Sequence, residues 1–434
     1  MAEKKSQKNY LTGKEIRKIV KDNARITRAL EKQKYRKAPE SEFTTELKDD
    51  GNILEIEDLH TYFFTEQGTV KAVNGVSLNI PKNATVGIVG ESGCGKSVTS
   101  MSVMRLIQGP AGQIVSGSIR FRAKDYKLSD GKPIPVYETN PDGTPVTETV
   151  TTNRGKEITV KKQATDETGA PLYQMEEKVY DIAKMPIHEI HRIRGRQIAM
   201  IFQEPMTSLN PVFTIGNQLD EVVFIHTAGA TKELAKNRSL EMLKLVGIAM
   251  PERVYASYPH ELSGGMRQRV MIAMALACNP RLIIADEPTT ALDVTIQAQI
   301  LDLLREIKTK MDGSIMLITH DLGIIAEMAD YVVVMYAGRV IEQGTVSEIF
   351  HNPMHPYTIG LQKSKPTMDS DSDKLFTIPG NVPNPINMPS HCYFKERCTR
   401  CTEKCSGEYP GFVKVSPTHY VACHLYSEVN ENEK

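Results

Sequence analysis

The chain has 434 residues, which exceeds one typical domain and predicts a large core with appended segments. Its charge is balanced, with 53 basic and 53 acidic side chains, so the composition does not indicate a nucleic-acid partner. No apolar run approaches the ~20 residues that span a bilayer, and the lysine-rich start has no apolar leader, so we expect a soluble, unsecreted protein with reduced cysteines.

Residues 1–50 form a polar, basic extension. Residues 1–40 contain 13 Lys or Arg and 5 Asp or Glu, a difference of +8. Ile16, Ile19 and Leu30 belong to a thin apolar stripe on a predicted helix. We expect a partly disordered, solvated tail, and contact of the stripe with anionic lipid is the alternative.

A phosphate-binding motif follows a predicted buried parallel strand at residues 84–89. Residues 90–97 fit G-x-x-x-x-G-K-[ST] and open a predicted helix over residues 97–107. Glycine is needed in such a loop because the backbone takes positive φ and brings its N–H groups against phosphate oxygens. Lys96 would contact the β and γ phosphates and Ser97 would bind Mg²⁺, whereas the alternative is a glycine-rich turn without a ligand.

The segment 122–185 is rich in Thr, Lys, Asp, Gly and Pro. Turn signals at residues 140–143 and alternation at residues 157–160 predict short hairpins. Nothing in the segment matches a ligand or nucleophile pattern, so we expect a surface excursion without a catalytic role.

Two further polar motifs follow this insertion. Residues 200–211 predict a strand that ends near Gln203 in a proline-bounded loop, and residues 215–246 are helical by periodicity. The next motif is Leu262-Ser263-Gly264-Gly265-Met266-Arg267-Gln268.

Two carboxylates, Asp286 and Glu287, end the apolar run 282–285, which predicts a central strand with a polar carboxyl end. Asp286 would hold a metal ion, and Glu287 would polarise an attacking water as general base. An isolated Asp-Glu pair is most often a solvated loop start. Here Asp293 follows, and His320 ends another apolar run, which weakens that alternative.

Taken together, these motifs resemble the nucleotide-binding subunit of an ATP-binding cassette transporter, in the family's order over about two thirds of the chain. The resemblance implies that Gln203 is the Q-loop glutamine and that the signature at Ser263 caps the γ-phosphate of an opposite subunit. It also implies that Asp286 and Glu287 are the Walker B pair, and that His320 is the switch histidine. The implied catalytic residues are Glu287, His320 and Gln203.

The resemblance also implies a set of ligands. The nucleotide-binding residues would be Phe63, Gly90, Glu91, Ser92, Gly93, Cys94, Gly95, Lys96, Ser97, Val98, Ser263, Gly264, Gly265, Met266 and, in a D-loop at Ala291-Leu292-Asp293, Asp293. The Mg²⁺ ligands would be Ser97, Gln203 and Asp286. Among Tyr62, Phe63 and Phe64, the spacing from Gly68 favours Phe63 as the ring that stacks on adenine, and the alternative is that all three are ordinary strand side chains.

The implied fold is an α/β P-loop ATPase with antiparallel β and helical subdomains and a cysteine-rich C-terminal extension. We expect the basic extension over residues 1–50, the cassette over residues 51–345 and the C-terminal extension over residues 346–434.

Because it has no predicted membrane span, the chain resembles the ATPase subunit of an importer, since importers usually keep their membrane spans on separate chains. Three sequence features resemble those of the oligopeptide and dipeptide importer ATPases. They are the sequence of residues 203–211, Met266 in the signature, and the sequence of residues 355–358. The implied function is ATP hydrolysis that drives oligopeptide uptake, at the cytoplasmic face of the membrane. The implied partners are a second ATPase subunit, two transmembrane permease subunits and an extracellular substrate-binding protein.

Two alternatives to this function stay open. The first is that the chain is the ATPase subunit of a related nickel or other small-solute importer, because such importers share much of the same motif sequence. A soluble cassette ATPase of translation or DNA maintenance is the alternative of another class, but such proteins typically carry two cassettes or a long coiled coil, and neither is present.

Five of the seven cysteines fall near the C-terminus, and four are spaced as in peptide-importer ATPases. For Cys392, Cys398, Cys405 and Cys423 the resemblance implies a four-iron, four-sulfur cluster. Zn²⁺ is the chemical rival, because four thiolates also suit tetrahedral zinc, and Cys401 departs from the pattern as a fifth thiol. For Cys94, in the phosphate loop, a helix N-terminus could lower the thiol pKa.

Overall fold

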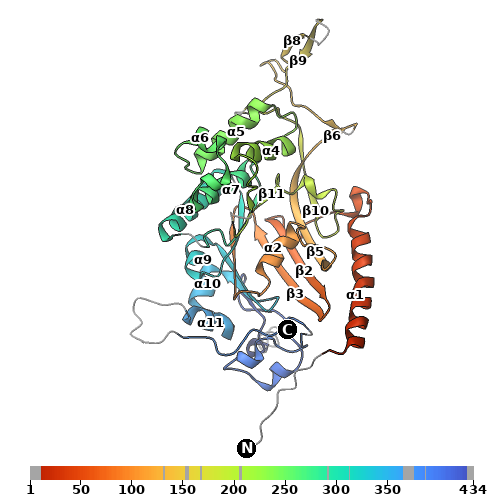
Figure 1. The fold of residues 1–434 in the computed structure, drawn as a ribbon, viewed down its shortest axis with the longest axis vertical. Coiled ribbons are helices and arrows are strands. Elements are labelled where there is room, and N and C mark those ends of the chain that lie inside the picture. The colour runs from red at the N-terminus through yellow and green to blue at the C-terminus, as the bar shows by residue number, and fades with distance from the viewer. Residues whose placement is uncertain are drawn as a thin grey trace, which may run out of the picture.

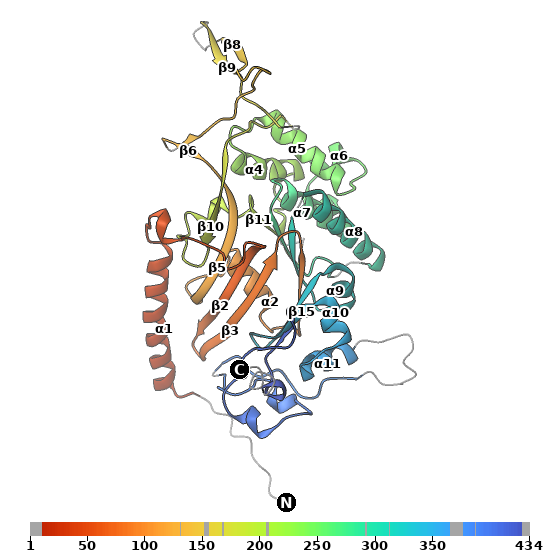
Figure 2. The same cartoon turned by 180° about the vertical axis from the view of Figure 1, so that it is seen from behind.

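The computed structural model describes residues 11–130, 132–151, 156–166, 169–204, 208–290, 293–311, 313–364, 376–386 and 388–427. Two large sheets organise the fold (Figures 1 and 2). The antiparallel sheet has the order β1 (Thr44–Thr45), β10 (Met175–Asp181), β5 (Gly112–Tyr126), β2 (Asn52–Thr65) and β3 (Gly68–Pro81). The central sheet has the order β11 (Ile198–Ile201), β12 (Leu282–Asp286), β13 (Ser314–Ile318), β4 (Thr85–Val89), β14 (Tyr331–Tyr336), β15 (Arg339–Thr345), β17 (Tyr420–Val421) and β16 (Val413–Lys414).

The first five strands of the central sheet are parallel and are covered on both faces. In β12, Ile283 and Ala285 belong to one hydrophobic core, while Leu282 and Ile284 belong to the other. Successive side chains of a strand point to opposite faces, so a strand buried on both faces is apolar at every position. This arrangement explains the continuous apolar runs of the sequence and confirms the expected parallel-sheet fold.

The helices of the described residues that Figure 1 labels form three groups. Beside the central sheet lie α2 (Lys96–Val103), α8 (Val294–Met311), α9 (Leu322–Met328), α10 (Val346–His351) and α11 (Pro356–Lys363). The helical subdomain at one end consists of α4 (Ile215–His226), α5 (Lys232–Leu245), α6 (Pro251–Ala256) and α7 (Gly264–Leu276). The third group is α1 (Gly13–Lys34) alone, and the single-turn 3-10 helices are η1 (Glu40–Glu42), η2 (Ile190–Arg192), η3 (Pro259–Glu261), η4 (Lys395–Arg397), η5 (Glu403–Ser406) and η6 (His424–Tyr426). None of the described helices combines the length and apolar composition needed to cross a membrane.

The polar insertion grows out of the antiparallel sheet between β5 and β10, which pair with each other. It contains two hairpins, β6 (Leu128–Ser129) with β7 (Lys132–Pro133) and β8 (Thr147–Thr151) with β9 (Glu157–Lys161). Figure 1 shows the β8–β9 hairpin projecting beyond the helical subdomain. The hairpins expected from the sequence are therefore confirmed.

From residue 11 onward the basic N-terminal segment is ordered against the cassette, whereas the sequence predicts a partly disordered, solvated tail; residues 1–10 lie outside the described residues. Its helix, α1, begins with a capping box between Thr12 and Glu15 and lies along the antiparallel sheet (Figure 2). The Asn23 side chain donates to the Thr65 carbonyl at 2.9 Å, and Gln113 donates to Glu31 at 2.5 Å. Polar contacts from this helix to the sheet, rather than a broad apolar stripe, hold the segment in place.

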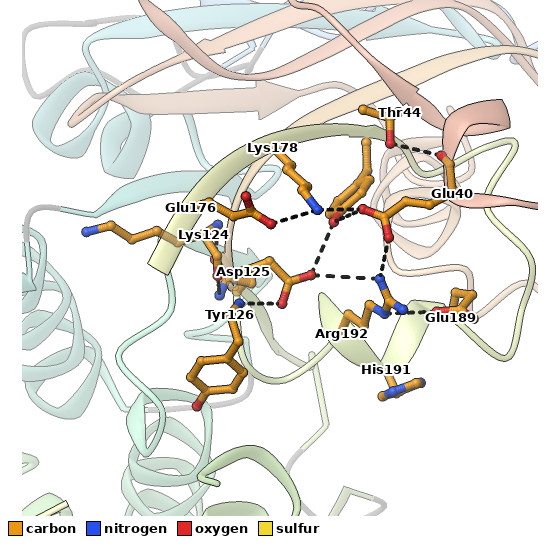
Figure 3. Close-up of polar contacts among 12 residues, drawn as sticks. Glu40, Thr44, Lys124, Asp125, Tyr126, Glu176, Lys178, Glu189, His191 and Arg192 are labelled. Carbon is orange, nitrogen blue, oxygen red and sulfur yellow. Dashed lines mark hydrogen bonds and ion pairs between the residues drawn. The ribbon is translucent and has the colours of Figure 1, made fainter. Parts of the chain in front are cut away.

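A network around Glu40 joins this segment to the root of the insertion (Figure 3). The Glu40 carboxylate accepts hydrogen bonds from Lys178 at 2.8 Å, from the Tyr180 hydroxyl at 3.2 Å and from Arg192 at 3.3 Å. The Tyr180 hydroxyl also contacts Asp125 at 3.1 Å. Three segments far apart in sequence therefore share one half-buried ionic cluster.

The C-terminal extension packs onto the cassette and adds two strands to the central sheet. Strand β17 pairs with β15, and the Ala422 amide donates to the Ile341 carbonyl at 2.7 Å. The buried Glu342 carboxylate accepts hydrogen bonds from the amides of Met354 and His355, and the ring of His419 lies 2.8 Å from it. The extension is thus part of the same core as the strands beside it.

Candidate functional site

The phosphate-binding loop connects β4 to α2 at the carboxyl edge of the central sheet. Gly90, Gly93 and Gly95 have φ values of 153°, 79° and 100°, and Gly95 is the N-cap of α2. The Lys96 side chain is 5% exposed, and its ammonium group donates to the carbonyls of Gly90 at 2.8 Å and Glu91 at 3.1 Å. The loop therefore surrounds a buried cation beside a helix N-terminus, an arrangement suited to phosphate.

Close backbone packing makes glycine necessary at two positions of the loop. A Cβ atom at Gly95 would lie 2.3 Å from the carbonyl oxygen of Ala72 in β3. A Cβ atom at Gly90 would lie 2.2 Å from the carbonyl oxygen of Met335 in β14. The loop thus packs closely against β3 and β14, and both this packing and its positive φ values require glycine.

Ser97 and Asp286 meet across adjacent elements of the site. The Ser97 hydroxyl donates to the Asp286 carboxylate at 3.1 Å, and Asp286 is 4% exposed. Burial raises the pKa of Asp286 above its usual value, and the hydrogen bond from Ser97 opposes that shift. A hydroxyl beside a buried carboxylate fits a divalent cation, because hard oxygen donors are the ligands that Mg²⁺ prefers.

Glu287 lies at the centre of a polar cluster formed by three strand ends. Its carboxylate accepts hydrogen bonds from Gln203 at 2.8 Å and from the Thr290 hydroxyl at 3.0 Å, and His320 Nδ1 lies 3.3 Å from its other oxygen. Its φ of +48° is rare for a residue with a side chain, and its amide donates to Ile318 at 2.8 Å. The structure therefore brings together Gln203, Glu287 and His320, as the sequence predicts.

Thr290 is a residue of this cluster that sequence reasoning missed. It follows Glu287 by three residues, and its amide donates back to the Glu287 carbonyl at 3.2 Å. This turn directs the hydroxyl to the carboxylate. The turn-forming Pro288 between them was the available signal.

The signature residues lie at the N-terminus of α7. The Ser263 hydroxyl accepts a hydrogen bond from the Met266 amide at 3.3 Å, and Ser263 and Gly264 are exposed. The buried Gln268 side chain of the same helix donates to the Pro288 carbonyl at 2.7 Å. This bond couples the signature helix to the turn that follows Glu287.

Asp293 precedes α8 and is exposed. Its carbonyl accepts a hydrogen bond from the Gln297 amide at 2.8 Å. The other two residues of the expected D-loop, Ala291 and Leu292, lie outside the described residues, as do Pro205, Met206 and Thr207 of the loop after Gln203.

The three aromatic residues of β2 have different surroundings. The Tyr62 hydroxyl donates to Asn74 at 2.9 Å, and Phe64 lines a cavity of about 190 Å³ against α1. Phe63 is half-buried and packs close to Gly112. Two of the rings thus have structural partners, and stacking of Phe63 on adenine stays a prediction.

The four C-terminal cysteines expected to act together are withdrawn from solvent, with Cys405 and Cys423 buried and Cys392 and Cys398 half-buried. Burial, together with the nearby thiols of Cys398 and Cys405, raises the pKa of Cys392 and of Cys423 to about 11. Cys401 is exposed. Nevertheless, within the described ranges no three His, Cys, Asp or Glu side chains are arranged to hold a metal ion.

The expectation of a lowered pKa for Cys94 is wrong. Cys94 is 1% exposed, and its burial raises the pKa of the thiol, while the charge of Lys96 opposes the shift. Removal of the thiolate from water outweighs the favourable field of the helix N-terminus.

Two family models match the chain. A model described as "ABC transporter" matches residues 73–182 and 170–290, and one described as "Oligopeptide/dipeptide transporter, C-terminal region" matches residues 341–405.

Curated relatives align over most of the chain. It is 44% identical to the oligopeptide transport ATP-binding protein AppD of Bacillus subtilis (strain 168), over 87% of this chain and 97% of the relative. It is 45% identical to the oligopeptide transport ATP-binding protein OppD of the same organism, over 86% of this chain and 88% of the relative. It is 42% identical to the dipeptide transport ATP-binding protein DppD, also from that organism, over 88% of this chain and 96% of the relative.

The packing of the phosphate loop predicts unequal effects of alanine at two of its glycines. Gly95→Ala combines positive φ with a clash against Ala72, so we expect the free energy of unfolding to fall by about 3 kcal/mol. At Gly93 a Cβ atom meets nothing within 4 Å, so Gly93→Ala should lower it by only about 1 kcal/mol. Urea unfolding of both variants would measure the difference, and equal losses would contradict the packing argument.

Proposed function

Because the chain belongs to the oligopeptide and dipeptide transporter family of ATP-binding cassette ATPases, we propose that it hydrolyses ATP to drive oligopeptide uptake through membrane-spanning subunits. The observation that carries the catalytic part is the convergence of Lys96, Asp286 and Glu287 at one edge of the central sheet. The names of these relatives favour peptides over nickel as the transported solute. We assign the cassette to residues 51–345 and the C-terminal extension to residues 346–434.

In this proposal the phosphate loop and Lys96 bind the phosphates of ATP. Lys96 would exchange its bonds to the Gly90 and Glu91 carbonyls for bonds to the β and γ phosphates. Ser97 and Asp286 would hold Mg²⁺, with Gln203 reaching the same ion. The bound metal supplies charge neutralisation at the phosphates.

Glu287 is the proposed general base. Gln203 and Thr290 bind one of its oxygens, and His320 lies beside the other, so the carboxylate is held in a single orientation. An oriented carboxylate can accept the proton of the water that attacks the γ-phosphate. His320 is 63% exposed and would contact the γ-phosphate from the open side of the site.

The first test removes the base without removing the binding site. Glu287→Gln should bind ATP like the wild type but hydrolyse it at least about 100-fold more slowly, because an amide cannot accept the proton. Lys96→Ala should instead weaken ATP binding at least about tenfold, because it removes a charge-assisted contact to phosphate. Nucleotide binding and phosphate release would be measured on each variant, and near-normal turnover by Glu287→Gln would remove the assignment.

The exposed signature supports a second ATPase subunit as a partner. Ser263 and Gly264 lie at the open N-terminus of a helix, where backbone N–H groups can bind phosphate. We propose that this end, together with Met266 and Asp293, completes the ATP site of a facing, similar but distinct subunit.

The membrane-spanning partners would cover an apolar surface of the helical subdomain. Phe213, Phe224 and Ile225 are exposed there and line a cavity of about 700 Å³ beside α4. This placement puts the chain at the cytoplasmic face of the membrane as a peripheral subunit. Two permease subunits and an extracellular substrate-binding protein would complete the importer.

The facing-subunit proposal predicts that the purified chain alone has low ATPase activity and gains activity with its partner ATPase. The reason is that each site lacks its γ-phosphate cap until a second signature arrives. ATPase assays combined with light scattering at the same protein concentration would test this. Full activity from a strictly monomeric preparation would show that the cap is not needed.

We further propose that Cys392, Cys398, Cys405 and Cys423 bind a four-iron, four-sulfur cluster with a structural role. Cys405 and Cys423 are buried, Cys392 and Cys398 are half-buried, and thiolates are the ligands that such clusters require. Zn²⁺ is the rival ion for the same donors.

Anaerobic purification tests the cluster directly. The protein should be brown, with absorbance near ~400 nm and about four irons per chain, because each thiolate holds one iron. Serine at any of the four positions should abolish the colour, whereas the exposed Cys401→Ser should keep it. A colourless anaerobic preparation that contains one zinc per chain would establish the zinc alternative.

A further inference from the structure

The C-terminal extension contacts the phosphate-binding loop at Glu91. Arg397 forms a bidentate ion pair with this residue, with its two terminal nitrogens 2.7 and 2.9 Å from the two carboxylate oxygens. The hydroxyl of Tyr357 accepts a hydrogen bond from the Glu91 amide at 2.9 Å. Arg397 and Tyr357 lie 306 and 266 residues from Glu91 in sequence, yet both bind the same residue of the loop.

Arg397 is fixed in place by the extension and by Tyr336 at the end of β14. It is 7% exposed, and its Nε donates to the Pro379 carbonyl at 2.9 Å. Its guanidinium lies against the rings of Tyr336 and Phe394. A planar, bidentate arginine held in this way is more restrained than a solvent-exposed ion pair, so it can determine the position of its partner.

Glu91 transmits this restraint to Lys96, the proposed phosphate-binding lysine. Its side chain is bound by Arg397, its amide by Tyr357, and its carbonyl accepts a hydrogen bond from Lys96 at 3.1 Å. The carboxylate, amide and carbonyl of Glu91 therefore all form hydrogen bonds. The carboxylate and the amide are bound by residues that follow β15 in the sequence. The conformation of the loop depends on contacts that the phosphate motif does not contain.

We propose that Arg397 is a positioning residue for the ATP site, through which the C-terminal extension holds the phosphate-binding loop in its binding conformation. The inference rests on the proposed function, namely that the loop binds ATP. Without the pair, the loop would occupy other conformations, and the apparent affinity would fall with the fraction of binding-competent molecules. Arg397 ends η4 and precedes Cys398, so the folded state of the cysteine-bearing segment determines whether it reaches Glu91.

The test compares Arg397→Met, Arg397→Lys and Glu91→Gln in the full-length chain. Binding of a non-hydrolysable ATP analogue with Mg²⁺ would be measured for each variant. We expect Kd to rise about tenfold in Arg397→Met and Glu91→Gln. We expect a smaller rise in Arg397→Lys, because lysine keeps the positive charge but cannot form two parallel hydrogen bonds to the carboxylate. The double variant Glu91→Gln with Arg397→Met should bind no more weakly than either single variant, because both remove one interaction. In the assembled transporter, KM for ATP should rise while kcat stays within about twofold.

Tyr393→Phe is the matched control. It removes a hydrogen bond of 2.9 Å to Asn74 from the same interface between extension and cassette, but it leaves the loop untouched. Its Kd should equal that of the wild type. The melting temperature of Arg397→Met would show whether this variant folds. If it does not fold, the affinity of Glu91→Gln for the ATP analogue tests the inference by itself, because this substitution removes the cassette's side of the ion pair.

The outcomes separate this inference from the proposed function. Wild-type affinity in both Arg397→Met and Glu91→Gln would overturn the inference, as would additive losses in the double variant or an equal loss in Tyr393→Phe. A wild-type chain that does not bind the ATP analogue would instead contradict the proposed function.

Discussion

Parallel pairing of β12, β13 and β4 determines where every polar group of the site lies. The register aligns Asp286 with Ile318 and Ile318 with Ile88, so all three strands end at one edge of the sheet. Polar residues that follow these strands must then meet in space, although they lie up to about 230 residues apart in sequence. A slip by one residue in this register would turn Asp286 away from Ser97, because neighbouring side chains point to opposite faces.

Burial of the central sheet on both faces connects this edge to the rest of the molecule. One face packs against the helical subdomain and the other against the antiparallel sheet. The bond from Gln268 to the Pro288 carbonyl then joins the signature helix to the turn after Glu287. Movement of the helical subdomain would therefore change the surroundings of Glu287, the proposed general base, which is the coupling that a transport ATPase needs.

The appended segments pack on the cassette rather than extending away from it. Helix α1 lies on the antiparallel sheet and is bound to it through Asn23 and Glu31, whereas the C-terminal extension continues the central sheet and reaches Glu91. An ion pair removed from water is favourable only when its hydrogen-bond geometry is close to ideal. The bidentate pair of Arg397 with Glu91 meets that condition. The extension thus contributes to the architecture of the nucleotide site as well as carrying the cysteines.

The parallel-sheet fold, the phosphate loop and the position of Lys96, Asp286 and Glu287 beside the strand ends could be predicted from the sequence, and the role of His320 was implied by the family resemblance. The prediction was possible because these features depend on local requirements, such as positive φ at Gly95 and polar residues directly after apolar strands. Tertiary structure alone decided that α1 packs on a sheet and that Arg397 binds Glu91. It also decided that burial dominates the pKa of Cys94. Each of these depends on the approach of segments distant in sequence, and no local pattern records which distant side chain will lie opposite a given residue.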